Sequence, residues 1–129
     1  MKDLRIVLVD DSPSIQEFIT RFLLRMKGCK LVGVAGDGEE ALLMIRMLHP
    51  HVVLLDVSMP VKNGVEVLRE LREENSEVMI IMFTADSSPR LRQACLTAGA
   101  NYFVCKTDFQ QLLDIIAELQ HGHSQHHPR

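Results

Sequence analysis

Val52-Val53-Leu54-Leu55-Asp56 is the stretch that decides the fold, because four apolar residues run without interruption into a carboxylate. A short, continuous apolar run that contains β-branched residues is typical of a strand that is covered on both faces of a parallel sheet. The same pattern occurs at residues 6–9, which are followed by Asp10 and Asp11. We therefore expect a buried parallel sheet whose strands end in polar residues.

Three further apolar runs predict the remaining strands, and helical patterns separate all five. The further strands are expected at residues 31–35, 78–83 and 102–105, and helices are expected to begin near residues 13, 38, 64, 89 and 109. Regular alternation of strands and helices is typical of an α/β fold with a parallel sheet. We predict a flavodoxin-like (βα)5 domain with strand order 2-1-3-4-5 and helices on both faces.

Length and composition restrict the class of protein further. The chain has 129 residues, of which 47% are hydrophobic and 24% charged, as expected for one globular domain. The net charge is −3 and no basic run is present, so we expect no direct nucleic acid binding by this chain. No apolar stretch is long enough to span a bilayer and no signal peptide is recognisable, which predicts a cytoplasmic protein without membrane association. The three cysteines are widely spaced, which favours core residues over a disulfide or zinc site.

We assign residues 1–120 to the domain and residues 121–129 to a His-rich C-terminal tail. The tail is polar and low in complexity, which favours a disordered end. A weak metal-binding tract and a cloning remnant are the alternatives.

Polar residues that could act together follow four of the five predicted strands. They are Asp10, Asp11, Asp56, Thr84 and Lys106. Because ligand sites of open α/β sheets form at the carboxyl edge, we expect these side chains to share one pocket. Three neighbouring carboxylates need a compensating cation, and Mg²⁺ prefers oxygen ligands, with Mn²⁺ as an alternative.

Asp56 could also act as a carboxylate nucleophile that accepts a phosphoryl group. Lys106 could then pair with the phosphoryl oxygens, and Thr84 could donate a hydrogen bond to one of them. Each residue alone has an ordinary structural explanation, since acids form turns and threonine suits strands. The prediction depends on their joint occurrence, and on the absence of a dinucleotide-binding, P-loop or nucleophile-elbow motif.

The sequence resembles the receiver domain of two-component response regulators over roughly residues 4–119. The motifs that carry the resemblance are Val9-Asp10-Asp11-Ser12, Leu54-Leu55-Asp56-Val57-Ser58-Met59-Pro60 with Asn63-Gly64, Phe83-Thr84-Ala85, and Ala98-Gly99-Ala100 before Lys106. Any one of these motifs is weak, whereas the set in this order and spacing is specific.

The resemblance implies a role for each of these positions. Asp56 matches the phosphoacceptor, and Asp10 and Asp11 match the acidic pair that positions Mg²⁺. The backbone carbonyl of Ser58 matches a further metal ligand. Thr84 and Lys106 match the residues that contact the phosphoryl group, and Phe103 matches the aromatic switch. It also implies a sensor histidine kinase or a histidine phosphotransfer protein as donor and an unknown downstream protein target. Phosphorylation would alter the face formed by the fourth helix, fifth strand and fifth helix. The chain would not be an enzyme apart from Mg²⁺-dependent self-phosphorylation and autodephosphorylation at Asp56.

One residue departs from the family pattern. Thr107 follows Lys106, where receivers usually have a proline after a cis peptide bond. Because a cis bond before a non-proline residue is unfavourable, we expect this loop to take a different path or to keep the isomer under strain.

Three other functions are alternatives to a phosphorylated receiver. The first is a receiver-like protein-binding module that signals without phosphorylation. The second is a metal-dependent phosphatase that acts on small phosphoesters. The third is the receiver of a longer DNA-binding regulator.

Overall fold

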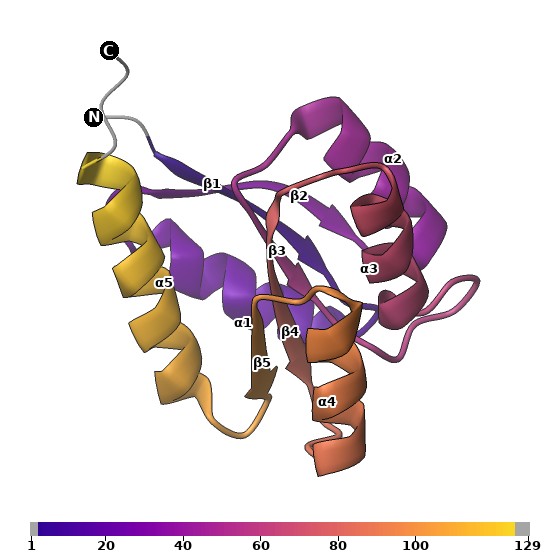
Figure 1. The fold of residues 1–129 in the computed structure, drawn as a ribbon. Helices are drawn as coiled ribbons and strands as arrows, with labels where there is room; N and C mark the ends of the chain where they lie inside the picture. The colour runs from indigo at the N-terminus through magenta and orange to yellow at the C-terminus, as the bar shows by residue number, and fades with distance from the viewer. Residues whose placement is uncertain (1–2, 126–129) are drawn as a thin grey trace.

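Strands and helices alternate along the chain in the computed structural model, which describes residues 3–125 (Figure 1). The strands are β1 (Leu4–Val9), β2 (Cys29–Ala35), β3 (Val52–Leu55), β4 (Met79–Thr84) and β5 (Tyr102–Cys105). The helices are α1 (Pro13–Leu24), α2 (Gly38–Leu48), α3 (Gly64–Glu73), α4 (Pro89–Ala98) and α5 (Phe109–Gln125).

The strands form one sheet in the order β2-β1-β3-β4-β5, and every neighbouring pair is parallel. Helices α1 and α5 cover one face, while α2, α3 and α4 cover the other (Figure 1). The predicted fold class and strand order are therefore confirmed.

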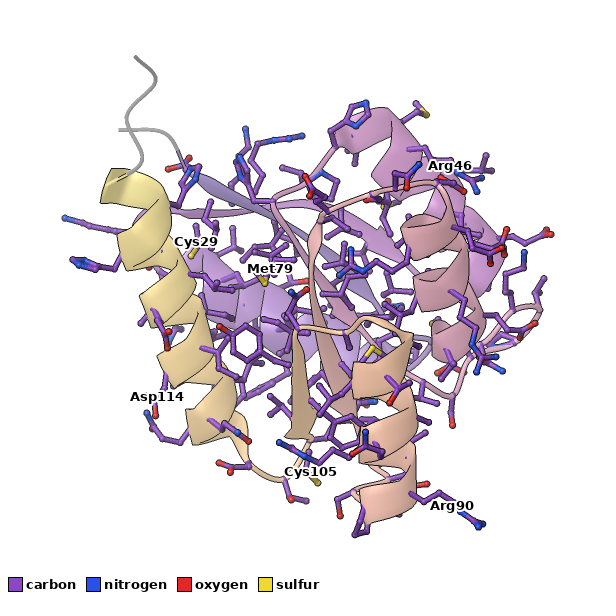
Figure 2. The ribbon with its side chains drawn as sticks, viewed as in Figure 1. Cys29, Arg46, Met79, Arg90, Cys105 and Asp114 are labelled. Atoms are coloured by element: carbon purple, nitrogen blue, oxygen red, sulfur yellow. The ribbon has the colours of Figure 1, made fainter. Side chains whose placement is uncertain are left out.

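The central strand β3 shows why its sequence has no polar alternation. Val53 and Leu55 belong to the core under α2, α3 and α4, whereas Val52 and Leu54 belong to the core under α1 and α5. All four are at most 1% exposed. Cys29 and Met79 pack against the second of these cores (Figure 2). Since both faces are covered, every position of such a strand favours an apolar side chain.

Short polar residues fix where three of the helices begin. The side chains of Ser12 and Ser88 accept hydrogen bonds from the backbone N–H groups of Ile15 and Leu91, and a proline follows each serine. Asn63 forms a capping box with Glu66 at the start of α3. Caps of this kind satisfy backbone donors that have no partner within the helix. They place the first turns of α1, α3 and α4 next to the strand ends.

The structure differs from the sequence prediction mainly at element ends. Strands β1 and β2 begin two residues earlier than predicted, because Leu4 pairs with Cys29 and Arg5 with Lys30 at the edge of the sheet. Helix α5 continues through Gln125, beyond the predicted domain boundary at residue 120. Residues 126–129 of the predicted disordered tail lie outside the described residues.

Candidate functional site

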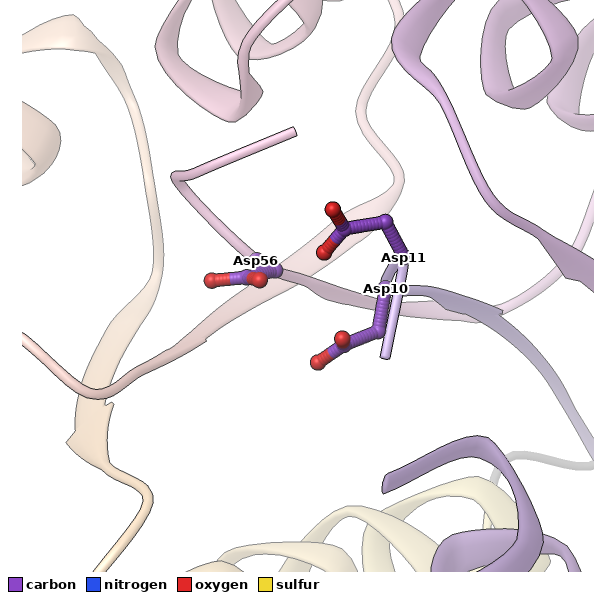
Figure 3. A group of neighbouring side chains, drawn as sticks. All are labelled: Asp10, Asp11 and Asp56. Carbon is purple, nitrogen blue, oxygen red and sulfur yellow. The ribbon is translucent and has the colours of Figure 1, made fainter. Parts of the chain in front are cut away.

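Three carboxylates gather at the carboxyl edge of the sheet. Asp10 and Asp11 directly follow β1, and Asp56 directly follows the neighbouring strand β3. One oxygen atom of each residue lies within 4.8 Å of those of the other two. Figure 3 shows the three carboxyl groups turned toward the same side of the sheet edge. The side chains come from distant parts of the sequence, and the parallel sheet brings them together.

The turn after β1 buries one acid of the pair and exposes the next. Asp10 is only 1% exposed, and its Oδ1 accepts a hydrogen bond of 2.9 Å from the backbone N–H of Ser12. The side-chain amide of Gln16 donates to the backbone oxygen of Asp10 at 2.6 Å. Asp11 is exposed. The site is therefore closed at Asp10 and open to solvent at Asp11.

Lys106 connects the two buried carboxylates. Its Nζ lies 2.8 Å from Asp10 Oδ2 and 3.3 Å from Asp56 Oδ2. Its backbone N–H donates to the backbone oxygen of Thr84 at 2.8 Å, which ties the end of β5 to the end of β4. A single ammonium group thus forms ion pairs with carboxylates that follow two neighbouring strands.

Burial and neighbouring charges shift the pKa values of Asp56 and Lys106. Burial, followed by repulsion from Asp10, raises the pKa of the Asp56 carboxyl above its usual range, although Lys106 and a backbone N–H of Ser58 act in the opposite direction. Burial on its own would lower the pKa of Lys106, but its hydrogen bonds with Asp10 and Asp56 and their charges raise that pKa instead. The surroundings thus stabilise the charged lysine and penalise the charge on Asp56.

The donor set fits a hard divalent cation. Three carboxylates with one ammonium group leave an excess of negative charge, and all the available ligand atoms are oxygens. Mg²⁺ prefers such ligands and usually keeps several waters. Asp10, Asp11 and Asp56 are the side chains that would hold it. Ser58 is exposed in the loop that follows Asp56, and the role of its carbonyl as a ligand stays a prediction.

An open cavity of about 690 Å³ adjoins the carboxylates. It is lined by Asp11 and Ser58, by apolar side chains that include Met59 and Val65, and by Leu91 at the start of α4. Through this opening the exposed side chain of Asp11 is accessible from solvent.

The two other predicted site residues lie on the strands beside this group. Thr84 ends β4 and is 2% exposed, and its hydroxyl accepts a hydrogen bond of 3.4 Å from the backbone N–H of Asp86. Phe103 of β5 is 6% exposed and packs in the core under α2, α3 and α4. Its proposed switching role would require this buried side chain to have a second position.

The loop after β5 takes the path without a cis bond. Within residues 3–125 every peptide bond is trans, including the bond between Lys106 and Thr107. The Thr107 hydroxyl lies 3.1 Å from the Cys105 sulfur, in a contact that a proline could not make. Lys106 reaches both carboxylates from this alternative path.

Two residues that support the site were not assigned a role from the sequence. A Cβ atom on Gly64 would lie 2.1 Å from the backbone oxygen of Asp56, so only glycine permits α3 to begin this close to the acid. Gln16 holds the backbone of Asp10, as described above. The Asn63-Gly64 pair was part of the recognised motif, but its physical reason depends on a contact that the sequence alone does not show.

The fold and the site together define a doubly wound parallel domain with a cluster of three carboxylates at its carboxyl edge. The model of the response regulator receiver domain family matches residues 6–117. The chain therefore belongs to the receiver domain family of response regulators, which act in two-component signalling.

Individual relatives agree with this assignment. The chain is 33% identical to the C4-dicarboxylate response regulator DctR of Bacillus subtilis over 81% of its own length and 46% of that protein. It is 36% identical to the protein-glutamate methylesterase/protein-glutamine glutaminase of the same organism over 87% of its own length and 32% of that protein. The chain thus spans less than half the length of these curated relatives.

A solved structure supports the same fold. The signal receiver domain of the response regulator NarL from Mycobacterium tuberculosis superimposes with a TM-score of 0.87 at 28% identity, covering 95% of this chain and 99% of that one. Among the helices in residues 3–125, none is both long and apolar enough to cross a membrane.

Proposed function

We propose that Asp56 accepts a phosphoryl group from a phosphohistidine donor. The observation that carries this proposal is the nearly buried Asp56 carboxylate, which is 5% exposed and lies beside Lys106 and the acidic pair Asp10 and Asp11. A carboxylate whose pKa is shifted by burial and by a specific charge partner is typical of a functional site.

The transfer forms one bond and breaks another. A carboxylate oxygen of Asp56 attacks the phosphorus atom, and the bond between phosphorus and the donor's imidazole nitrogen breaks. The electron pair stays with that nitrogen, which takes up a proton, and Asp56 becomes an aspartyl phosphate. Attack by water on phosphorus later releases inorganic phosphate and restores the carboxylate, which is the autodephosphorylation expected of such a site.

Neighbouring residues would stabilise the charge that moves onto Asp56. Lys106 lies within 3.3 Å of the accepting side chain, so its ammonium group can move from the carboxylates to the phosphoryl oxygens. Thr84 would exchange its contact with Asp86 for a hydrogen bond to a phosphoryl oxygen. A divalent ion held by Asp10, Asp11, Asp56 and the Ser58 carbonyl would neutralise charge on the transferring group.

The new charge would then act on a surface that binds partners. A phosphoryl group adds roughly −1.5 to −2 charges and three acceptor oxygens. Movement of Thr84 toward it would alter the packing around Phe103 and the face formed by α4, β5 and α5. The donor would be a sensor histidine kinase or a histidine phosphotransfer protein, and the target a downstream protein that recognises this face.

Intact-mass measurement after incubation with acetyl phosphate tests the proposal. We expect a phosphoryl adduct that requires Mg²⁺ and is lost in the Asp56→Asn variant. Asp114→Asn removes an exposed carboxylate on α5, outside the acidic group, and should form the adduct like the native chain. A folded, Mg²⁺-binding native chain without an adduct would contradict the proposal and favour a protein-binding module that signals without phosphorylation.

A further inference from the structure

A second concave surface lies between α3 and α4, on the side of α4 that faces away from β5 and α5. This open groove has a volume of about 600 Å³. It is lined by Arg69 of α3 and by Arg90, Gln93, Ala94, Thr97 and Ala98 of α4. No carboxylate is among these lining residues. We call this surface the arginine groove.

The two arginine side chains of the groove have no polar partner among the described residues. Arg46, by contrast, pairs with Glu74, and Arg21 pairs with Glu17 at 2.6 Å. Both Arg69 and Arg90 are exposed. Guanidinium groups bind carboxylates in a planar, two-pronged geometry, so a pair of unpartnered arginines across a groove favours an anionic ligand.

One end of the groove is fixed by a third arginine. Arg72 of α3 donates to the backbone oxygen of Gly99 from Nε at 3.0 Å and from Nη2 at 2.8 Å. It also donates from Nη1 to the backbone oxygens of Ser76 and Val78 at 2.8 and 2.9 Å. These bonds hold the C-terminal end of α4 against α3 and the sheet.

The other end of the groove lies at the start of α4, where Leu91, the residue after Arg90, lines the cavity that also contains Asp11 and Ser58. Arg90 is the second residue of α4, and residues 85–88 connect that helix to Thr84. Figure 2 shows Arg90 at one end of α4, with its side chain directed away from the sheet. Only Cys95 of α4 is fully buried, so little packing restrains this end of the helix.

We propose that the arginine groove binds an acidic peptide segment of a partner protein, and that phosphorylation of Asp56 changes its affinity. The groove is open rather than enclosed, which fits a peptide segment on the surface better than a buried small molecule. The net charge of −3 opposes a polyanion such as nucleic acid more strongly than it opposes a short acidic peptide. The coupling to phosphorylation rests on the proposed function, whereas the binding itself does not.

Fluorescence anisotropy with a labelled peptide of alternating glutamate and alanine tests the binding. We expect the unmodified native chain to bind at low salt and to lose affinity as salt rises. Arg69→Gln and Arg90→Gln should each weaken binding about threefold, and the double variant about tenfold, as expected for exposed ion pairs. Arg25→Gln is the matched control, because Arg25 is an exposed arginine that caps α1 on the other face of the sheet.

Three results would overturn the groove as an acidic-peptide site. They are no binding by the native chain at low salt, equal binding by the native chain and the double variant, and tighter binding of a short DNA duplex than of the peptide. If Arg25→Gln lowers the peptide affinity as much as Arg69→Gln does, the binding depends on overall charge and not on the groove.

The coupling is tested by repeating the titration after incubation with acetyl phosphate and Mg²⁺, with the adduct checked by mass. A change in affinity of about fivefold or more, absent in Asp56→Asn, is the expected result. An adduct without a change in affinity would overturn the coupling and leave the peptide site standing. Absence of the adduct would instead count against the proposed function, while binding by the unmodified chain still decides whether the groove is a site.

Discussion

Asp56 bears its charge in surroundings that favour the neutral carboxyl. The residue is 5% exposed and faces Asp10, and together these effects outweigh the attraction of Lys106, so the pKa of Asp56 is raised. In the unfolded chain the same carboxyl has an ordinary pKa near 4. Ionisation of Asp56 therefore lowers the free energy of unfolding, and the proposed phosphoryl transfer requires this ionised form.

The Asp56→Asn variant should consequently be more stable than the native chain at neutral pH in the presence of a chelator. A raised folded-state pKa gives stability that is present at low pH and is lost as pH rises through that pKa. The neutral asparagine avoids this loss, so its advantage should disappear below the ordinary pKa of aspartate. Thermal unfolding of both proteins between acid and neutral pH measures the difference. A native chain that is the more stable of the two at neutral pH would contradict this account.

Val61 occupies a backbone conformation that disfavours its side chain. Its φ is +69°, and the Lys62 N–H donates to the Pro60 oxygen at 2.7 Å, which closes a three-residue turn around it. A β-branched residue at positive φ is a steric outlier. The turn connects Asp56 to α3. It also packs against the start of α2, since a Cβ atom on Gly38 would lie 2.1 Å from the backbone oxygen of Lys62.

Val61→Gly should raise the free energy of unfolding by about 1 kcal/mol, since relief of the strained conformation exceeds the entropy that glycine loses on folding. The side chain is 74% exposed, so its removal costs little packing. Val61→Ala keeps a Cβ atom and should gain less. Urea denaturation measures both variants. A destabilised glycine variant would show that the surrounding structure does not impose this strain.

At the level of elements, α4 is the least firmly packed helix on its face of the sheet. Cys95 is its only fully buried residue, whereas α3 buries Gly64, Val67, Leu68 and Leu71. Hydrogen bonds from Arg72 replace the missing apolar contact. Its guanidinium also reaches Asn101 Oδ1 at 3.0 Å, and that atom in turn accepts from the backbone N–H of Ile80. One polar side chain thus joins α3, α4 and the sheet.

Arg72→Met should therefore lower the free energy of unfolding by about 3 kcal/mol, because it leaves several backbone carbonyls without their donor. Amide exchange should accelerate in α4 more than in α1, since α4 depends most on these bonds. Arg69→Met is the matched control on the same helix, where an exposed side chain is removed, and it should change stability by no more than about 0.5 kcal/mol. Equal effects of the two substitutions would contradict a special role for Arg72.

At the scale of the whole molecule, one sheet separates two apolar cores. Leu68 of α3 lies in one core and Leu112 of α5 in the other, and neither is exposed to solvent. Adjacent residues of β3 contribute to opposite cores, so loss of packing in one core also destabilises the other. We infer that both cores unfold together.

Leu68→Ala and Leu112→Ala should each destabilise the entire domain by about 2–5 kcal/mol and keep a single unfolding transition. The loss reflects buried side-chain volume that the surrounding structure cannot refill. Leu24→Ala removes a side chain that is 78% exposed and should have little effect. Circular dichroism and fluorescence followed during urea unfolding would report two separate transitions if the cores were independent.

Much of the fold and of the site's composition was determined by the sequence itself. Continuous apolar runs such as Val52–Leu55 predicted the buried strands, the intervening helical patterns predicted a parallel sheet, and the strand order was confirmed. The polar residues that follow those runs predicted which side chains would meet at one edge. These features can be predicted from the sequence because strand burial and helix periodicity are local properties of the chain.

Only the tertiary structure decided how closely the segments approach one another. It showed that Lys106 pairs with Asp10 as well as with Asp56, that Gly64 lies against the Asp56 backbone, and that Arg69 and Arg90 line one groove. It also extended β1 and β2 at the sheet edge and α5 through Gln125. Such contacts join residues far apart in sequence, and their distances depend on how the crossover helices pack on the sheet, which no local pattern specifies.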